Sequence, residues 1–98
     1  MGGVEEIIDK WRRSNDDARL EDVRKVINEK IAPRAKVIFK KRGTSHVISI
    51  SHQCLKGEST FKGRPNFNVV CSDGRKVTKF YYQDILVAIA ALDKFEEK

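Results

Sequence analysis

Two stretches near the start of the chain repeat their apolar residues at helical spacing. The first stripe includes Trp11 and predicts an amphipathic helix over residues 3–13. The second predicts a helix over residues 19–31, and Pro33 ends it because proline has no backbone N–H to continue the hydrogen-bond ladder. We expect Trp11 to dock its helix on the core.

After Arg34 the apolar residues fall at every second position. This alternation predicts a strand that ends in the basic triplet of residues 40–42, followed by a hairpin turn in which Gly43 supplies a positive φ. The next strand runs from His46 to His52. Its alternation places both histidines on one face, one at each end, with two isoleucines between them.

The second half of the chain predicts further strands and a closing helix. Residues 53–66 contain two glycines and a proline and predict a loop that is long for a small domain. Strands are expected over 67–71 and 76–80, joined by a turn at 72–75, and a helix over about 82–96. The order α-α-β-β-β-β-α predicts an α+β domain, with helices on one face of a three- to four-stranded antiparallel sheet.

Charge separates the middle of the chain from its ends. The 98 residues fit a single domain and carry 20 Lys and Arg against 14 Asp and Glu, a net charge of +6. Residues 33–79 hold eleven of the bases and two of the acids, a net charge of +9. A solvated face is one interpretation. A polyanion site is the other, with nucleic acid as the first candidate and an anionic membrane surface as the second.

Several classes of protein are excluded by what the sequence lacks. No apolar run is long enough to span a membrane, and the first residues lack a signal-peptide pattern, so we expect a cytoplasmic protein. There is no P-loop and no hydrolase elbow, and carboxylates are too few in the middle for a two-metal nuclease. His46, His52, Cys54 and Cys71 match no compact zinc motif, so neither a metal nor a cofactor is expected.

Histidine chemistry on a phosphate is what remains. RNA cleavage needs a base for the 2′-OH, an acid for the leaving 5′-oxygen and cations near phosphorus, and imidazole changes its charge near neutral pH. His46 is the catalytic candidate, with His52 as a weaker second one and ordinary strand-end packing as the alternative. Ser45 would orient the imidazole or the scissile group. The predicted RNA-binding residues are Lys40, Lys41, Arg42, Gly43, Thr44, Ser45 and Lys79.

The segment Gly43-Thr44-Ser45-His46-Val47-Ile48 resembles the Gly-Ser-His or Gly-Ser-Ser-His signature of the HicA toxins, also called the YcfA-like family. Residues 8–23 look like the N-terminal extension of longer HicA-like proteins, which makes 1–17 a helical extension. Residues 81–86 are similar to the start of their closing helix. Two departures stand out: residues 77–81 lack the Pro and His that the family often has there, and the loop 53–66 is longer.

The resemblance implies an α-β-β-β-α fold like that of double-stranded-RNA-binding domains (dsRBDs). It also implies a toxin–antitoxin endonuclease, a hydrolase that cleaves mRNA without a metal, with His46 as its catalytic residue. A cognate HicB-type antitoxin would cover the site. Two alternatives stay open from the residues themselves: a nucleic-acid-binding module that does not cleave, and a protein-interaction or inhibitor domain.

Overall fold

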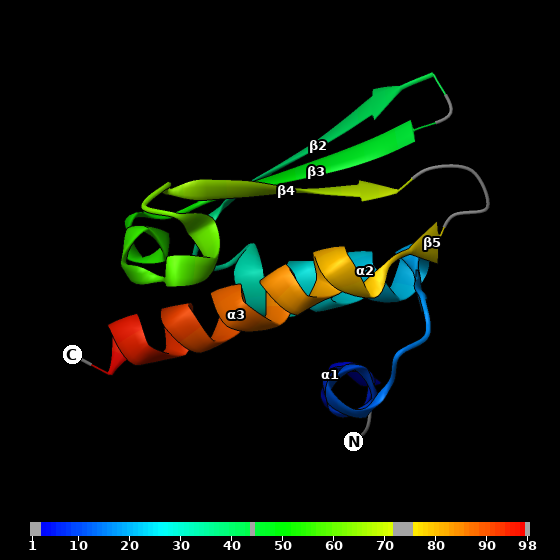
Figure 1. Cartoon of the computed structure of the whole chain (residues 1–98), viewed down its shortest axis with the longest axis horizontal. Coiled ribbons are helices and arrows are strands. Elements are labelled where there is room, and N and C mark those ends of the chain that lie inside the picture. Colours follow the sequence, from blue (N-terminus) through cyan, green and yellow to red (C-terminus); the bar gives the residue numbers. More distant parts are fainter. Residues whose placement is uncertain (1–2, 44, 72–75, 98) are drawn as a thin grey trace.

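Three helices and a three-stranded antiparallel sheet form the body of the protein in this computed structural model (Figure 1). The structure describes residues 3–43, 45–71 and 76–97. No helix within these ranges is long and apolar enough to cross a membrane. In chain order the elements are α1 (Gly3–Arg13), β1 (Ala18–Arg19), α2 (Leu20–Val26), the π-helical turn η1 (Ile27–Ile31), β2 (Lys36–Arg42), β3 (Ser45–Ser51), the 3₁₀ turns η2 (Gln53–Gly57) and η3 (Ser59–Phe61), β4 (Asn66–Cys71), β5 (Lys76–Val77) and α3 (Lys79–Glu96).

The sheet has the strand order β2-β3-β4, and α2 and α3 both lie along one of its faces (Figure 1). Ile48 and Ile50 of β3 point toward these helices and are buried, as the alternation predicts. No described helix covers the opposite face. Gly43 has a φ of +57°, so the predicted turn residue adopts the left-handed conformation that glycine tolerates best.

The helical layer carries α1 on the side away from the sheet (Figure 1). Trp11 is buried and stacks on Tyr82 of α3 with ring centroids 5.0 Å apart, which confirms its docking role. The Tyr82 hydroxyl donates to the backbone carbonyl oxygens of Asp16 at 2.9 Å and Ser14 at 3.3 Å. One buried phenol therefore ties the segment after α1 to the core.

The sheet has three strands, the lower number of the predicted three to four, because the strand predicted over 76–80 does not join it. β5 has only two residues and pairs with β1, in the register Ala18 with Val77, as a separate two-stranded ribbon. The helix α3 begins at Lys79, three residues before the predicted start. The cause is the period of the apolar residues, because Tyr82 and Ile85 are buried at a spacing of three and place this segment on a helix. The predicted turn at 72–75 lies outside the described residues.

Residues 53–66 are more ordered than the predicted loop. They contain η2 and η3, which bury Leu55 and Phe61 in the core. Phe61 stacks on Phe67 of β4 at 4.7 Å, and the backbone N–H of His52 donates to the carbonyl oxygen of Pro65 at 2.8 Å. The segment closes one end of the core, because its two apolar side chains cover residues that a plain loop would leave in water.

Candidate functional site

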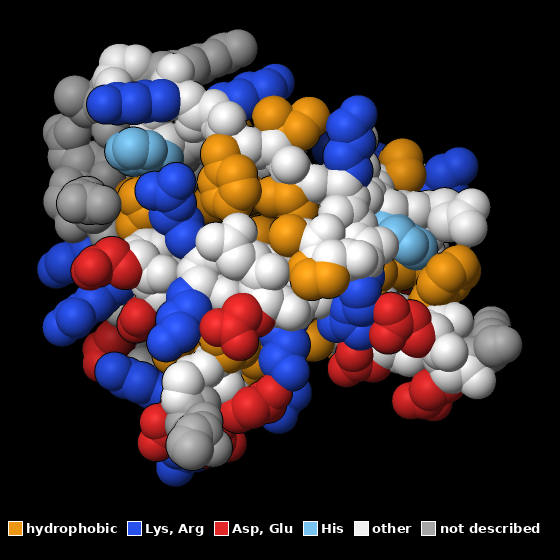
Figure 2. All heavy atoms as spheres, turned by 180° about the vertical axis from the view of Figure 1, so that it is seen from behind, with side chains coloured by type: hydrophobic (Ala, Val, Ile, Leu, Met, Phe, Trp, Pro, Cys, Tyr) orange, Lys and Arg blue, Asp and Glu red, His pale blue; other side chains and the backbone are white. Residues whose placement is uncertain are grey.

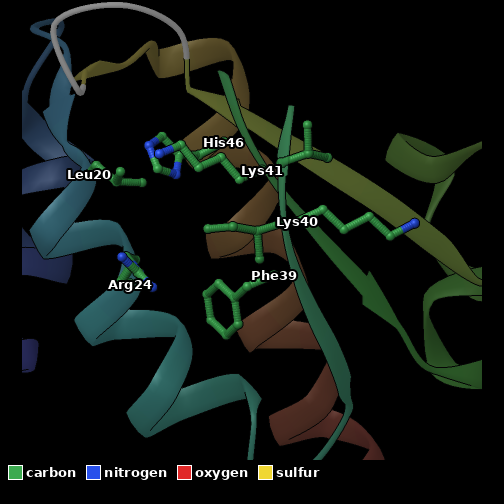
Figure 3. A pocket seen from close by; sticks show the side chains of 8 residues that line it. Leu20, Arg24, Phe39, Lys40, Lys41 and His46 are labelled. Carbon is green, nitrogen blue, oxygen red and sulfur yellow. The ribbon is translucent and has the colours of Figure 1, made fainter. Parts of the chain in front are cut away.

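A groove of about 220 Å³ lies between α2 and the β2–β3 hairpin (Figure 3). The buried side chains of Leu20 and Ile48 line its apolar part. Four basic residues also line it: Arg24, Lys40, Lys41 and the half-buried His46. The groove therefore combines an apolar lining with basic side chains.

Lys41 and His46 are direct partners across the β2–β3 ladder. Residues directly opposite each other in an antiparallel ladder point to the same face, with Cβ atoms about 5 Å apart. Both side chains point toward Leu20 and the start of α2. Lys40 also lines the groove, but the end of its side chain points away to the other side of the strand (Figure 3). The structure brings Lys41 to the histidine and separates Lys40 from it.

Arg24 reaches the groove from α2. Its guanidinium lies over the ring of Phe39, 5.3 Å from the ring centroid, in a cation–π contact that fixes its direction. Sequence reasoning missed this residue because it comes from another element. The available signal was its spacing, since Arg24 lies one helical turn after the buried Leu20 and so projects from a neighbouring position on the same face.

The groove is electropositive. None of the described residues that line it is acidic, and Arg24 and Lys41 form no ion pair with any described residue. Figure 2 shows where the acids lie on one face: Lys, Arg and both histidines surround apolar side chains in its upper half, and Asp and Glu lie in its lower half among further Lys and Arg. An anion approaching the groove meets positive charge without a competing carboxylate.

The other predicted contact residues lie elsewhere. Ser45 pairs with Arg42 across the ladder, one position from the Lys41–His46 pair, so its side chain projects from the opposite face. Thr44 and the side chain of Arg42 lie outside the described residues. Lys79, in the first turn of α3, donates from Nζ to Asn15 Oδ1 at 2.6 Å and does not line the groove.

His52 occupies the far end of β3 and has a structural role. Its Nδ1 accepts the backbone N–H of Cys54 at 3.0 Å, which caps η2, and its ring meets Phe95 edge-on with centroids 4.9 Å apart. It lies six positions after His46, which is about 20 Å along an extended chain. The second histidine is therefore too far away to share a reaction with the first.

Neither cysteine lines the groove, although the buried Cys71 is the partner of His46 across the β3–β4 ladder. Burial, and then the nearby Glu58 carboxylate, raise the pKa of the Cys54 thiol, so it stays protonated and less reactive. The described residues contain no group of three or more His, Cys, Asp or Glu side chains placed to hold a metal ion.

No protein-family model, curated protein or solved structure matches this chain. What the groove can do therefore follows from its own geometry. An imidazole beside an ammonium and a guanidinium can exchange a proton while the two cations hold a phosphate. The apolar lining from Leu20 and Ile48 excludes part of the surrounding water, which strengthens those interactions.

Proposed function

We propose that this chain is an RNA-binding endoribonuclease that cleaves mRNA with His46 as its proton-transfer residue. The observation that carries the proposal is the cross-strand pair of Lys41 and His46 beside Arg24, in a groove whose described lining residues include no acid. Its membership of the HicA-like toxins, and hence of a toxin–antitoxin system, rests on the short Gly43–His46 signature.

The arrangement of the elements supports a dsRBD-like fold. The order α2, β2, β3, β4, α3 gives a helix, three antiparallel strands and a helix, with both helices on one face. This is the α-β-β-β-α order that the HicA resemblance implies. On this interpretation α1 is an N-terminal extension packed on the helical layer.

In the proposed mechanism the imidazole of His46 takes the proton from a ribose 2′-OH. The 2′-oxygen then attacks phosphorus, the bond to the 5′-oxygen breaks, and that oxygen leaves as a hydroxyl after protonation by the imidazolium or by water. The products are a 2′,3′-cyclic phosphate and a 5′-OH. No net proton is consumed, because the one removed from the 2′-oxygen balances the one given to the 5′-oxygen.

Lys41 and Arg24 stabilise the charge that develops on the phosphate oxygens. Lys41 is an ammonium next to the imidazole, and Arg24 presents a planar guanidinium that can donate two parallel hydrogen bonds to a phosphate. Because the Phe39 ring holds Arg24 in place, little of its side-chain entropy is lost when RNA binds.

A second candidate is an RNA-binding module that does not cleave. It is favoured by the position of His52, which leaves the groove with one histidine where many metal-independent reactions use two proton-transfer groups. For the endoribonuclease, the HicA resemblance implies a cognate HicB-type antitoxin that would cover the groove. Co-expression with the product of a neighbouring reading frame tests that partner, and relief of growth arrest is the expected result.

The deciding experiment uses the purified chain, a single-stranded RNA and EDTA. We expect cleavage to 5′-OH ends, a loss of at least about 100-fold in rate for His46→Gln, and retained RNA binding by that variant. His52→Gln is the matched control and should cleave at the parent rate. A parent that binds RNA without cutting it favours the second candidate, and 5′-phosphate products or an active His46→Gln variant contradict the mechanism.

A further inference from the structure

A second hollow lies at the opposite edge of the sheet from the groove. It has a volume of about 250 Å³ and is bounded by η3, by β4 and by the first turns of α3. The groove lies against β2 and this hollow against β4, the two outer strands of the sheet. A ligand in one is therefore separable from chemistry in the other.

The hollow presents an aromatic ring to water. Phe80 lines it and is 70% exposed, the highest exposed fraction among the large apolar side chains in the described part of the chain. Its ring meets Tyr81 edge-on, with centroids 5.2 Å apart and an interplanar angle of 81°. Much of the ring surface is therefore free, which suits stacking against a flat ligand.

The other lining residues are mostly polar, which distinguishes the hollow from an apolar docking pocket. Asn66 and Asn68 bring amide groups from β4, and Lys62 and Arg64 bring cations from the preceding segment. The Asn68 Oδ1 accepts from the Ser49 hydroxyl at 2.8 Å, which leaves its NH₂ group to donate. Single-stranded nucleic acids are bound by this combination of an aromatic platform, amides that read base edges and cations for phosphates.

Asp84 adds an acceptor to the hollow. Its carboxylate is half-buried, lines the hollow and has no hydrogen-bond or ion-pair partner among the described residues. Burial raises the pKa of Asp84, so the charged form lacks compensation from the fold. A ligand with amino or imino hydrogens, such as the edge of a nucleic-acid base, would donate hydrogen bonds to this carboxylate and compensate its charge.

We infer that this hollow binds an unpaired base of single-stranded RNA, stacked on Phe80 and read by Asn66, Asn68 and Asp84. The cations Lys62 and Arg64 flank it and contact the adjoining phosphates. This inference rests on the proposed RNA-binding function and gives the substrate a class: RNA with unpaired nucleotides in place of a continuous duplex. Base recognition at the β4 edge then positions the strand for the groove at the β2 edge.

The test measures binding by the full chain carrying His46→Gln, which prevents cleavage. Affinities are compared for a single-stranded oligoribonucleotide and for a blunt duplex of the same sequence. Phe80→Ala and Phe80→Leu should each weaken single-strand binding by about 10-fold, since a stacked base contributes that much, and leave duplex binding unchanged. Phe80→Trp keeps a stacking surface and should bind like the parent. Phe95→Leu alters a partly exposed phenylalanine at the other end of α3 and serves as the control.

Thermal unfolding of each Phe80 variant verifies the fold, and 4-thiouridine crosslinking maps the contact directly. The expected crosslinks fall in the peptides that contain Phe80 and residues 62–68. Parent-like binding by Phe80→Ala, or an equal loss for single strand and duplex, overturns the inference while leaving the groove proposal standing. Parent-like binding by Phe80→Leu also overturns it, because leucine offers no aromatic face on which a base could stack. Equally tight binding of free mononucleotides overturns it in favour of a small ligand. A parent that binds no RNA overturns the proposed function as well.

Discussion

The two histidines of this chain stand at the two ends of one strand and on one face of it, yet their surroundings differ. His52 is committed to the fold, because Nδ1 caps η2 and the ring packs on Phe95. His46 has no hydrogen-bond partner among the described residues and lies in a groove next to Lys41. A pattern of two histidines on one strand therefore says where they point, while neighbouring elements decide which one is available for chemistry.

The cations at the two ends follow the same division. Near His52, the guanidinium of Arg34 bonds Asp93 at 2.6 Å and Glu96 at 3.1 Å, and its Nε donates to the Lys30 carbonyl oxygen at 2.9 Å. Burial alone would lower the pKa of Arg34, and the hydrogen bonds to the two carboxylates reverse this, so its pKa is raised. At the other end Arg24 and Lys41 form no ion pair with any carboxylate in the described part of the chain. Paired cations stabilise the fold, and unpaired ones are free for a ligand.

The sharpest test of this division compares two adjacent lysines. Lys41→Gln should lower the rate of RNA cleavage by about 100-fold, because it removes a cation next to the developing charge. Lys40→Gln is the matched control: it removes the same charge from the other face of the strand and should change the rate by no more than about 3-fold, through one phosphate contact or fewer. The measurement is kcat/KM on a single-stranded RNA.

If the two lysine variants lose equal activity, the lysines act through the total positive charge of the surface. That result would contradict a specific role for Lys41 beside His46. Thermal unfolding should be the same for both variants, because neither lysine has an ion-pair partner in the described chain.

At the other end of the sheet, replacing a cation by glutamine should lower the stability of the fold. Arg34→Gln removes charge-assisted hydrogen bonds from a side chain that is 17% exposed, so we expect a loss of about 1–2 kcal/mol in the free energy of unfolding. Urea unfolding measures it, with Lys36→Gln as an exposed control. RNA cleavage by Arg34→Gln, assayed where it stays folded, should match the parent. A fall in cleavage without a fall in stability would place Arg34 in the catalytic site. It would contradict the distinction between paired cations that stabilise the fold and unpaired cations that bind a ligand.

The histidines themselves give a smaller stability difference. His52→Ala removes the cap on η2 and the contact with Phe95 and should destabilise the fold by about 1 kcal/mol. His46→Ala removes no described hydrogen bond and should stay within about 0.5 kcal/mol of the parent. Chemical unfolding of both variants measures the difference. A larger loss for His46→Ala would mean that its ring packs as a structural residue, which is the alternative interpretation of a strand-end histidine.

Sequence patterns predicted the parts of this molecule that depend on local periodicity. The first two helices, the hairpin with its turn at Gly43 and the shared face of His46 and His52 follow from spacings of 3.6 and 2. The same alternation already separates Lys40 from Lys41, although their adjacency suggested a single cluster. Arg24 could not be placed with His46, since only the packing of α2 on the sheet brings the two together.

The error before α3 has a related cause. Phe80 looks like the last apolar residue of a strand, but it lies three positions after Val77, and a segment this short does not exclude a helix. Burial of Tyr82 settles the helical start and leaves Phe80 on the surface. The sequence pattern therefore suggested that Phe80 is a buried strand residue, and the exposed ring beside β4 was not predicted.

The smallest predicted effect concerns Asp84. Its carboxylate lacks a partner in the described chain, so it allows the comparison of paired and unpaired charged groups to be repeated at the β4 edge. A raised pKa means that the folded chain binds this proton more tightly than the unfolded chain, so Asp84 adds stability below its ordinary pKa and loses it as the pH rises through the raised value. At neutral pH, Asp84→Asn should therefore stabilise the fold by less than about 1 kcal/mol after solvent screening, and the gain should vanish below about pH 4. Unfolding measured at pH 7 and pH 3.5 tests both signs. A destabilised variant at pH 7 would show that the carboxylate supports the fold, and that an unpaired charge in this chain does not mark a ligand site.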